Sequence, residues 1–254
     1  KAEECIVPPA QWPTKGAIQF NKLSALYGDS ASGVRDFSLN IEPGQTVGIC
    51  GRTGSGKSSI ISALLRLVEI SSGSIVIDDL DIATLPRQII RESILVATQD
   101  PLIIPGSLRF NIDPEENAAD EAVSNALNRF GLAHLVERLG GIDHDVKADN
   151  LSRGEQLLVG LARLVLSKRN EQGVLLLDEV TSNLDADAEE VVQRVLKDDF
   201  GAYTKIVVAH HLHTILESDV IVVMEQGSLV EVGNPKTLLG KQGGKLAQLM
   251  ELEL

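Results

Sequence analysis

The chain has 254 residues, a formal net charge of −13 at pH 7 and a hydrophobic fraction of 43%, which suits one large domain or two small ones with a substantial core. The acidic balance argues against a nucleic acid or an anionic membrane surface as the main partner, because both require basic patches. No apolar stretch approaches the roughly 20 residues of a membrane span. The two cysteines, Cys5 and Cys50, are too few for a disulfide framework or a metal cluster, and Cys50 is expected in the core.

The predicted elements follow the order of an α/β domain with a helical insertion. Residues 1–15 hold three prolines without apolar periodicity, so an extended linker anchored by Trp12 is expected there. Strand-like segments follow at residues 17–27, 34–41, 46–50 and 74–78. Residues 101–166 are more helical, with apolar residues at helical spacing over 118–130 and 155–167. Strand–helix alternation then resumes, with strands predicted at 174–178, 205–209 and 220–224 and a helix at 187–197.

A glycine-rich stretch joins the strand at 46–50 to a helical pattern, and it reads Gly51-Arg52-Thr53-Gly54-Ser55-Gly56-Lys57-Ser58-Ser59. Strand, glycine-rich loop and helix form the context of a phosphate-binding P-loop, in which backbone N–H groups converge on one centre. The helix N-terminus adds partial positive charge there. Lys57 is predicted to reach the β- and γ-phosphates and Ser58 to ligate Mg²⁺. The predicted nucleotide-binding residues of the loop are Gly51, Thr53, Gly54, Ser55, Gly56, Lys57, Ser58 and Ser59. The alternative is a merely flexible Gly/Ser loop.

A second candidate site lies at the end of residues 173–179, which read as a buried strand followed by two carboxylates, Asp178 and Glu179. Ligand groups in open α/β sheets lie at the carboxyl ends of the strands. Asp178 is predicted to hold the Mg²⁺ shell, and Glu179 to orient or deprotonate the attacking water. The alternative is that these acidic residues only form a turn or cap a helix.

Further motifs resemble those of the ATP-binding domains of ABC transporters. Residues 151–156, Leu-Ser-Arg-Gly-Glu-Gln, resemble the ABC signature and depart from it at Arg153. The resemblance implies that Ser152, Arg153, Gly154 and Glu155 serve a nucleotide held by a partner domain. Without it, a serine and a glycine before a helix indicate only an N-cap.

The remaining motifs of that family fall in their usual order. Gln99 resembles the Q-loop glutamine, which is a Mg²⁺ ligand and couples to the membrane domains, and the resemblance makes it a catalytic residue together with Glu179 and His210. Residues 182–185 resemble the D-loop, with Asp185 at its end. His210 resembles the switch histidine that contacts the γ-phosphate, and Tyr27 the A-loop aromatic that stacks on adenine. Each residue also has a plain alternative as a loop or strand-edge side chain.

The resemblance implies an α/β fold: a RecA-like P-loop NTPase core with an N-terminal antiparallel β-subdomain and an inserted helical subdomain, about residues 101–166, that carries the signature. Residues 1–15 are then a linker from a membrane domain outside this sequence, and residues 16–254 are the ABC ATP-binding domain. Residues 12–16, 51–54 and 106–114 are similar to the second nucleotide-binding domain of C-subfamily, multidrug-resistance-associated transporters. Glu179 fits that assignment.

In such transporters the domain is an ATPase that takes ATP and Mg²⁺ and works at the cytoplasmic face of a membrane. The implied partners are a second nucleotide-binding domain of the same polypeptide, in a head-to-tail dimer, and the transmembrane domains that export a substrate; no nucleic acid is expected. Two alternatives stay open. One is a cytosolic ABC ATPase of translation or DNA repair, and the other is a regulatory module in which nucleotide binding gates a channel or partner.

Overall fold

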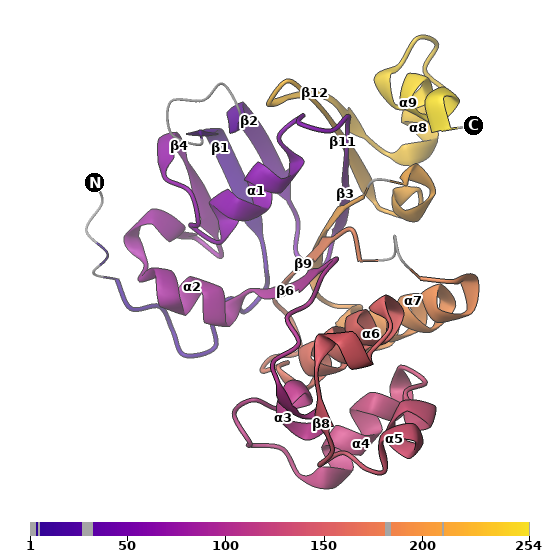
Figure 1. Ribbon diagram of the computed structural model, residues 1–254. Coiled ribbons are helices and arrows are strands. Elements are labelled where there is room, and N and C mark those ends of the chain that lie inside the picture. The colour runs from indigo at the N-terminus through magenta and orange to yellow at the C-terminus, as the bar shows by residue number, and fades with distance from the viewer. Residues whose placement is uncertain (1–3, 5, 27–32, 181–183, 210, 254) are drawn as a thin grey trace. The chain divides into compact units, whose positions relative to one another are not determined.

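The computed structural model describes residues 4, 6–26, 33–180, 184–209 and 211–253 (Figure 1). Tyr27, Ser182, Asn183 and His210 lie outside the described residues. The chain divides into two compact units. The first consists of Lys1–Ile94, Asn170–Glu179 and Ala202–Leu254, and the second of Leu95–Arg169 and Val180–Gly201.

The first unit contains an antiparallel sheet of four strands in the order β2-β1-β4-β5. These strands are β1 (Ile18–Leu26), β2 (Gly33–Ile41), β4 (Ile70–Ile77) and β5 (Leu80–Asp81). Alternate side chains of β1 and β2 are buried, and the rings of Phe20 and Phe37 meet edge to face with centroids 5.1 Å apart. The expected N-terminal antiparallel β-subdomain is confirmed. The strand predicted at 74–78 is wrong at its start, since β4 begins at Ile70 and continues along β1 through two register shifts.

The second sheet of this unit carries the apolar strands of the core in the order β12-β11-β3-β10-β9. They are β3 (Thr46–Cys50), β9 (Val174–Asp178), β10 (Thr204–Val208), β11 (Val220–Glu225) and β12 (Ser228–Gly233). The pairs among β11, β3, β10 and β9 are parallel, and β12 pairs antiparallel to β11. Continuous apolar runs such as Val174 to Leu177 are buried, as expected for strands covered on both faces.

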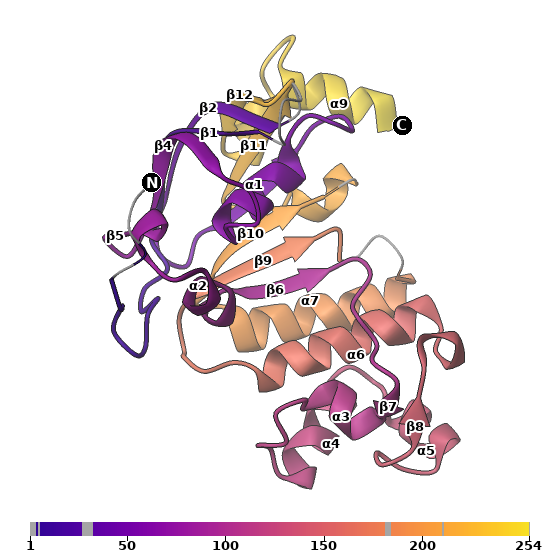
Figure 2. The same cartoon turned by 60° about the vertical axis from the view of Figure 1, so that its left-hand side comes forward.

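Helices and short turns complete the first unit (Figure 2). They are α1 (Lys57–Leu64), η1 (Ile82–Thr84), α2 (Arg87–Ser93), η3 (Leu212–Ile215), α8 (Pro235–Leu239) and α9 (Lys245–Glu253). Cys50, Ile215, Ile221, Leu238 and Leu246 join one buried cluster beneath the C-terminal helices. Cys50 is therefore a core residue, as predicted.

The N-terminal segment is fastened to the first unit. Trp12 is buried, and its indole N–H donates to the Ile77 carbonyl over 3.1 Å. The carboxylate of Asp78 accepts from the backbone N–H groups of residues 14, 15, 16 and 17. Further back, the carboxylate of Glu4 accepts from Arg66 (2.9 Å) and Arg87 (3.2 Å). The predicted anchoring by Trp12 is thus present, and polar contacts add to it.

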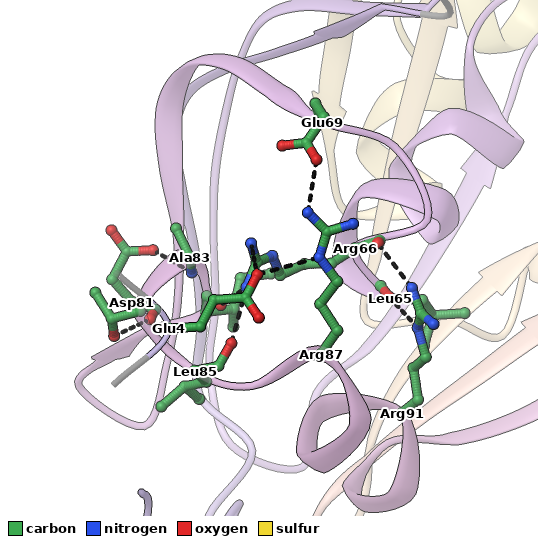
Figure 3. Close-up of polar contacts among 11 residues, drawn as sticks. Glu4, Leu65, Arg66, Glu69, Asp81, Ala83, Leu85, Arg87 and Arg91 are labelled. Carbon is green, nitrogen blue, oxygen red and sulfur yellow. Dashed lines mark hydrogen bonds and ion pairs between the residues drawn. The ribbon is translucent and has the colours of Figure 1, made fainter. Parts of the chain in front are cut away.

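Arg66 connects that segment to the end of α1 (Figure 3). Its guanidinium also donates to the carbonyls of Ile82 (3.2 Å) and Leu85 (2.8 Å). Arg91, on α2, donates to the carbonyls of Leu65 (3.0 Å) and Arg66 (2.9 Å), which follow the last turn of α1. Cations there satisfy carbonyl groups that the helix leaves without partners. The helix that starts at the glycine-rich loop is therefore held firmly at its other end.

The second unit is mainly helical. Its elements are β6 (Leu95–Thr98), β7 (Gly106–Ser107), α3 (Leu108–Ile112), α4 (Asp120–Arg129), α5 (Ala133–Leu139), β8 (Asp145–Val146), η2 (Ala148–Asn150), α6 (Arg153–Leu166) and α7 (Ala186–Phe200). The three helices predicted here match α4, α6 and α7, with bounds that differ by a few residues. Leu157, Val159 and Leu161 of α6 are buried, as are Val123 and Leu127 of α4. None of the helices in the described ranges has the length and apolarity needed to cross a bilayer.

Candidate functional site

The glycine-rich loop forms a tight connection between β3 and α1. Gly51 has φ +146°, and a Cβ at this position would lie 2.2 Å from the Met224 carbonyl oxygen. Only glycine fits such a conformation and such an approach of backbone to backbone. The loop closes further on with Ser55 N–H donating to the Arg52 carbonyl over 3.0 Å. The first turn of α1 leaves the N–H groups of Lys57 and Ser58 without intrahelical acceptors, so they can serve a bound anion.

Lys57 points back over the loop that precedes it. Its Nζ donates to the carbonyls of Gly51 (2.8 Å) and Arg52 (3.4 Å), and the residue is 5% exposed. Burial lowers the pKa of Lys57 below its usual value, and the nearby charges of Glu179, Cys50 and Asp178 act in the opposite direction. The interaction with both carboxylates indicates that the ammonium group and the acidic pair share one site.

The parallel sheet explains why the loop and the acidic pair meet. Val208 of β10 lies between Ile49 of β3 and Asp178 of β9 in the strand register. The three strands run in the same direction, so their carboxyl ends emerge at one edge, where ligands bind in open α/β sheets. Glu179 continues this row, because its N–H donates to the Val208 carbonyl over 2.9 Å. The structure therefore brings together the loop and the carboxylates predicted from the sequence.

Glu179 adopts a backbone conformation that is rare for its type, with φ +56°. Holding a residue other than glycine in the left-handed region costs of order 1–3 kcal/mol of conformational free energy, and such strain occurs often at functional sites. Here the strain turns the chain immediately after β9. The sequence carried no signal for this conformation.

A hairpin turn is hydrogen-bonded to the glycine-rich loop. Gln226 (φ +50°) and Gly227 (φ +84°) form the two-residue connection between β11 and β12. The Gly227 N–H donates to the Ser55 carbonyl over 2.9 Å, and the Gly227 carbonyl accepts from the Arg35 N–H over 2.8 Å. The turn therefore ties the loop to β2. Gln-Gly between two apolar strands is the kind of signal that predicts such a hairpin, although the contact with the loop is not readable from the sequence.

Oxygen ligands for a divalent cation are available beside the loop. Ser58 supplies a hydroxyl in the first turn of α1, and Asp178 a carboxylate at the end of β9. No group of three or more His, Cys, Asp or Glu side chains in the described part of the chain could hold a metal ion. Mg²⁺ commonly binds through one or two protein oxygens together with substrate phosphates, so this donor set fits that ion.

The other predicted site residues that the structure describes belong to the second unit. Gln99 follows directly after β6. The segment beyond it is tied to α6 by Arg163, whose guanidinium donates to the carbonyls of Leu102 (2.9 Å) and Asn111 (2.6 Å). Asp185 is the N-cap of α7, and its carboxylate accepts from the Ala188 N–H over 2.9 Å.

The signature residues form the start of α6. Ser152 is the N-cap, and it shares a capping box with Glu155. Arg153 is exposed, and Gly154 is half-buried. Glu155 is buried beside Arg138, which lies 3.0 Å away. The cap explains why α6 begins at Arg153, two residues before the helix predicted at 155–167.

A glycine-rich loop between a strand and a helix, at the edge of a parallel sheet with acidic residues after a neighbouring strand, defines the P-loop NTPase class. The family model described as "ABC transporter" matches residues 34–182. The chain belongs to the ABC transporter family. This chain is an ATP-binding domain of that family.

Relatives and a solved structure agree with that family. The chain is 46% identical over 243 residues to "ABC multidrug transporter B" of Aspergillus fumigatus, covering 96% of this chain and 16% of that protein. It is 39% identical over 243 residues to "ATP-binding cassette sub-family C member 2" of Rattus norvegicus, covering 93% of this chain and 15% of that protein. A bacterial Atm1-family ABC exporter with ATP bound has a similar structure, with a TM-score of 0.86, 29% identity, and coverage of 98% of this chain and 44% of that one. The chain thus spans a small part of the length of the curated relatives that it matches.

Proposed function

We propose that this chain binds MgATP at its P-loop and hydrolyses it, and that hydrolysis powers substrate export by a longer membrane transporter that contains it. The observation that carries the proposal is the register of β3, β10 and β9, which sets Asp178 and Glu179 beside the loop that holds Lys57. A cation, a helix N-terminus and two carboxylates at one sheet edge match the chemistry of phosphoryl transfer.

On binding, Lys57 exchanges its contacts with the Gly51 and Arg52 carbonyls for the β- and γ-phosphates. The first-turn N–H groups of α1 point toward the same phosphates. Ser58, Asp178 and Gln99 are the proposed ligands of Mg²⁺, which when bound neutralises charge on the phosphates. Tyr27 is proposed to stack on adenine.

Hydrolysis then depends on positioned groups of the chain. Glu179 accepts a proton from the attacking water or orients that water. Its left-handed backbone conformation sets the direction in which the side chain leaves the main chain. His210 is proposed to contact the γ-phosphate. Catalysis is mainly positioning and charge stabilisation, as expected for a loose phosphoryl transition state.

The proposed partners are a second nucleotide-binding domain, arranged head to tail, and transmembrane domains at the cytoplasmic face of a membrane. Ser152 and Gly154, with Arg153 and Glu155, would face the nucleotide of the partner domain, and Asp185 would lie in the D-loop at that interface. ATP favours the closed pair, and loss of the γ-phosphate lets it open, which is a population shift driven by differential contacts.

We further propose that residues 1–15 connect to the last membrane helix and that the chain is the second domain of a C-subfamily exporter. The 39% identity to a sub-family C member supports the assignment to that subfamily.

The test is ATP hydrolysis by the full-length purified transporter in lipid, with and without candidate substrates. The proposal predicts hydrolysis that at least one transported compound stimulates. A transporter that binds ATP, gates a partner and does not turn ATP over would instead support the regulatory alternative.

A further inference from the structure

Glu155 is a buried carboxylate in the first turn of α6, with its oxygens committed to different partners. One oxygen, Oε2, accepts from the Ser152 N–H over 2.8 Å, while the Ser152 Oγ accepts from the Glu155 N–H over 3.2 Å. This reciprocal pair fixes the backbone on both sides of Gly154. The loop before it is held as well, because the Gln156 side-chain amide donates to the carbonyls of Ala148 (2.9 Å) and Leu151 (3.1 Å).

The other oxygen of Glu155 faces two basic residues of α5. Arg138 Nη2 lies 3.0 Å from Glu155 Oε1, and His134 Nε2 lies 3.6 Å from the same atom. The second ring nitrogen of His134, Nδ1, lies 2.9 Å from the Gly131 carbonyl oxygen. Arg138 is the permanent cation of this cluster, because a guanidinium group is always charged in proteins. Its helix is anchored by Leu135, which is fully buried.

The balance of charge at Glu155 depends on Arg138. Burial raises the pKa of a carboxyl group, but the Ser152 N–H and hydroxyl and the Arg138 guanidinium hold the pKa of Glu155 below its usual range. Without Arg138, a charged Glu155 would be a buried carboxylate with no strong cation beside it, which is an unfavourable state. It would also leave an uncompensated negative charge among the signature residues proposed to face a triphosphate, directly after Gly154.

We infer that Arg138 is a positioning residue for the ATP of the partner domain. By neutralising Glu155, it allows a carboxylate to hold Ser152 in place without repelling the phosphates that Ser152 and Gly154 approach. The inference rests on the proposed role of the signature residues. Arg138 itself lies on α5, outside the P-loop, the carboxylate pair and the signature.

The test is a double-mutant cycle in the full-length transporter, with ATP hydrolysis measured over a range of ATP concentrations. Arg138→Met is made in the natural background and in a Glu155→Gln background, and Arg138→Lys is made alone. In the natural background, Arg138→Met should raise the half-saturating ATP concentration and lower the maximal rate about ten-fold, because ATP held against this chain's signature stabilises the closed pair in which this chain's own P-loop site hydrolyses ATP. Arg138→Lys should retain most activity, because it keeps the charge. In the Glu155→Gln background, the same Arg138→Met change should alter the rate by less than about two-fold, because no buried charge remains to be compensated.

The matched control is Arg194→Met. Arg194 of α7 also pairs with a glutamate, Glu190, over 3.0 Å, but both side chains are exposed and neither belongs to the signature. This variant should leave the kinetics unchanged. Equal losses from Arg138→Met in both backgrounds would overturn the inference, as would a lower maximal rate at an unchanged half-saturating concentration, which indicates only less folded protein.

Glu179→Gln, assayed in parallel, separates this inference from the proposed function. If Glu179→Gln removes turnover while Arg138→Met has no effect, the role of Arg138 is refuted and the proposed function stands. If Glu179→Gln leaves turnover intact, the proposed function fails, and the inference fails with it.

Discussion

Replacement of Gly51 by alanine tests whether the glycine-rich loop is fixed by backbone packing. The new Cβ would lie 2.2 Å from the Met224 carbonyl oxygen and 2.7 Å from Ser55 Oγ, and the first of these is backbone that cannot rotate away. Overpacking of this kind costs about 1–3 kcal/mol. The φ of +146° adds about 1–3 kcal/mol of strain for a residue with a side chain. The expected loss of unfolding free energy is therefore about 2–6 kcal/mol.

Gly54→Ala is the matched control in the same loop. Gly54 has φ +80°, but an added Cβ there would meet nothing described within 4 Å. Only the conformational cost of about 1–2 kcal/mol applies. Thermal unfolding of the 254-residue chain without nucleotide measures both variants, and each kcal/mol should shift the midpoint by about 2–4 °C for a domain of this size. Equal shifts for the two variants, or a larger shift for Gly54→Ala, would refute the reasoning.

The remaining predictions concern nucleotide binding and the C-terminal helices. Lys57→Ala should weaken MgATP binding by about 2–5 kcal/mol in calorimetry, and near-normal affinity would contradict the P-loop assignment. Tyr27→Ala should weaken ATP binding by about 1–3 kcal/mol while Tyr27→Phe is nearly neutral, whereas equal losses would make Tyr27 a structural residue. Burial raises the pKa of Glu231, but the Lys241 ammonium and the Leu246 N–H outweigh it and hold this pKa below its usual value. A lowered folded pKa gives stability above the unfolded value that is lost as pH falls, so Glu231→Gln should destabilise the chain by about 1–3 kcal/mol at pH 7, and urea unfolding should show this gap closing below about pH 4.

Elements with a clear local pattern were predictable from the sequence. The strands at 46–50 and 174–178 have the predicted bounds, because each is a short apolar run with glycine or acidic residues at its end. The P-loop and the acidic pair meet because parallel strands share one carboxyl edge, which is a general rule of this fold. The start of β4 was missed because Ser71-Ser72-Gly73 reads locally as a turn, whereas pairing with β1 makes it a strand.

Contacts between distant segments were not predictable. The hydrogen bond from the Gly227 N–H to the Ser55 carbonyl joins residues far apart in the sequence, and nothing in the sequence around either residue indicates this contact. The pairing of Arg138 with Glu155 requires knowing that α5 packs near the start of α6. The signature serine, by contrast, was predicted as a functional residue and also acts as a helix cap, so the two readings of Ser152 are compatible.

The most direct test of the account is steady-state hydrolysis and ATP trapping by the full-length transporter carrying Glu179→Gln. The carboxylate is not needed to hold the triphosphate, so ATP binding should persist. Hydrolysis should fall nearly to zero, and the closed ATP-bound state should accumulate. If half of the turnover survives, a second site is active and the assignment of this chain to the hydrolytic domain of an asymmetric C-subfamily exporter is wrong. If all of it survives, Glu179 has no part in catalysis.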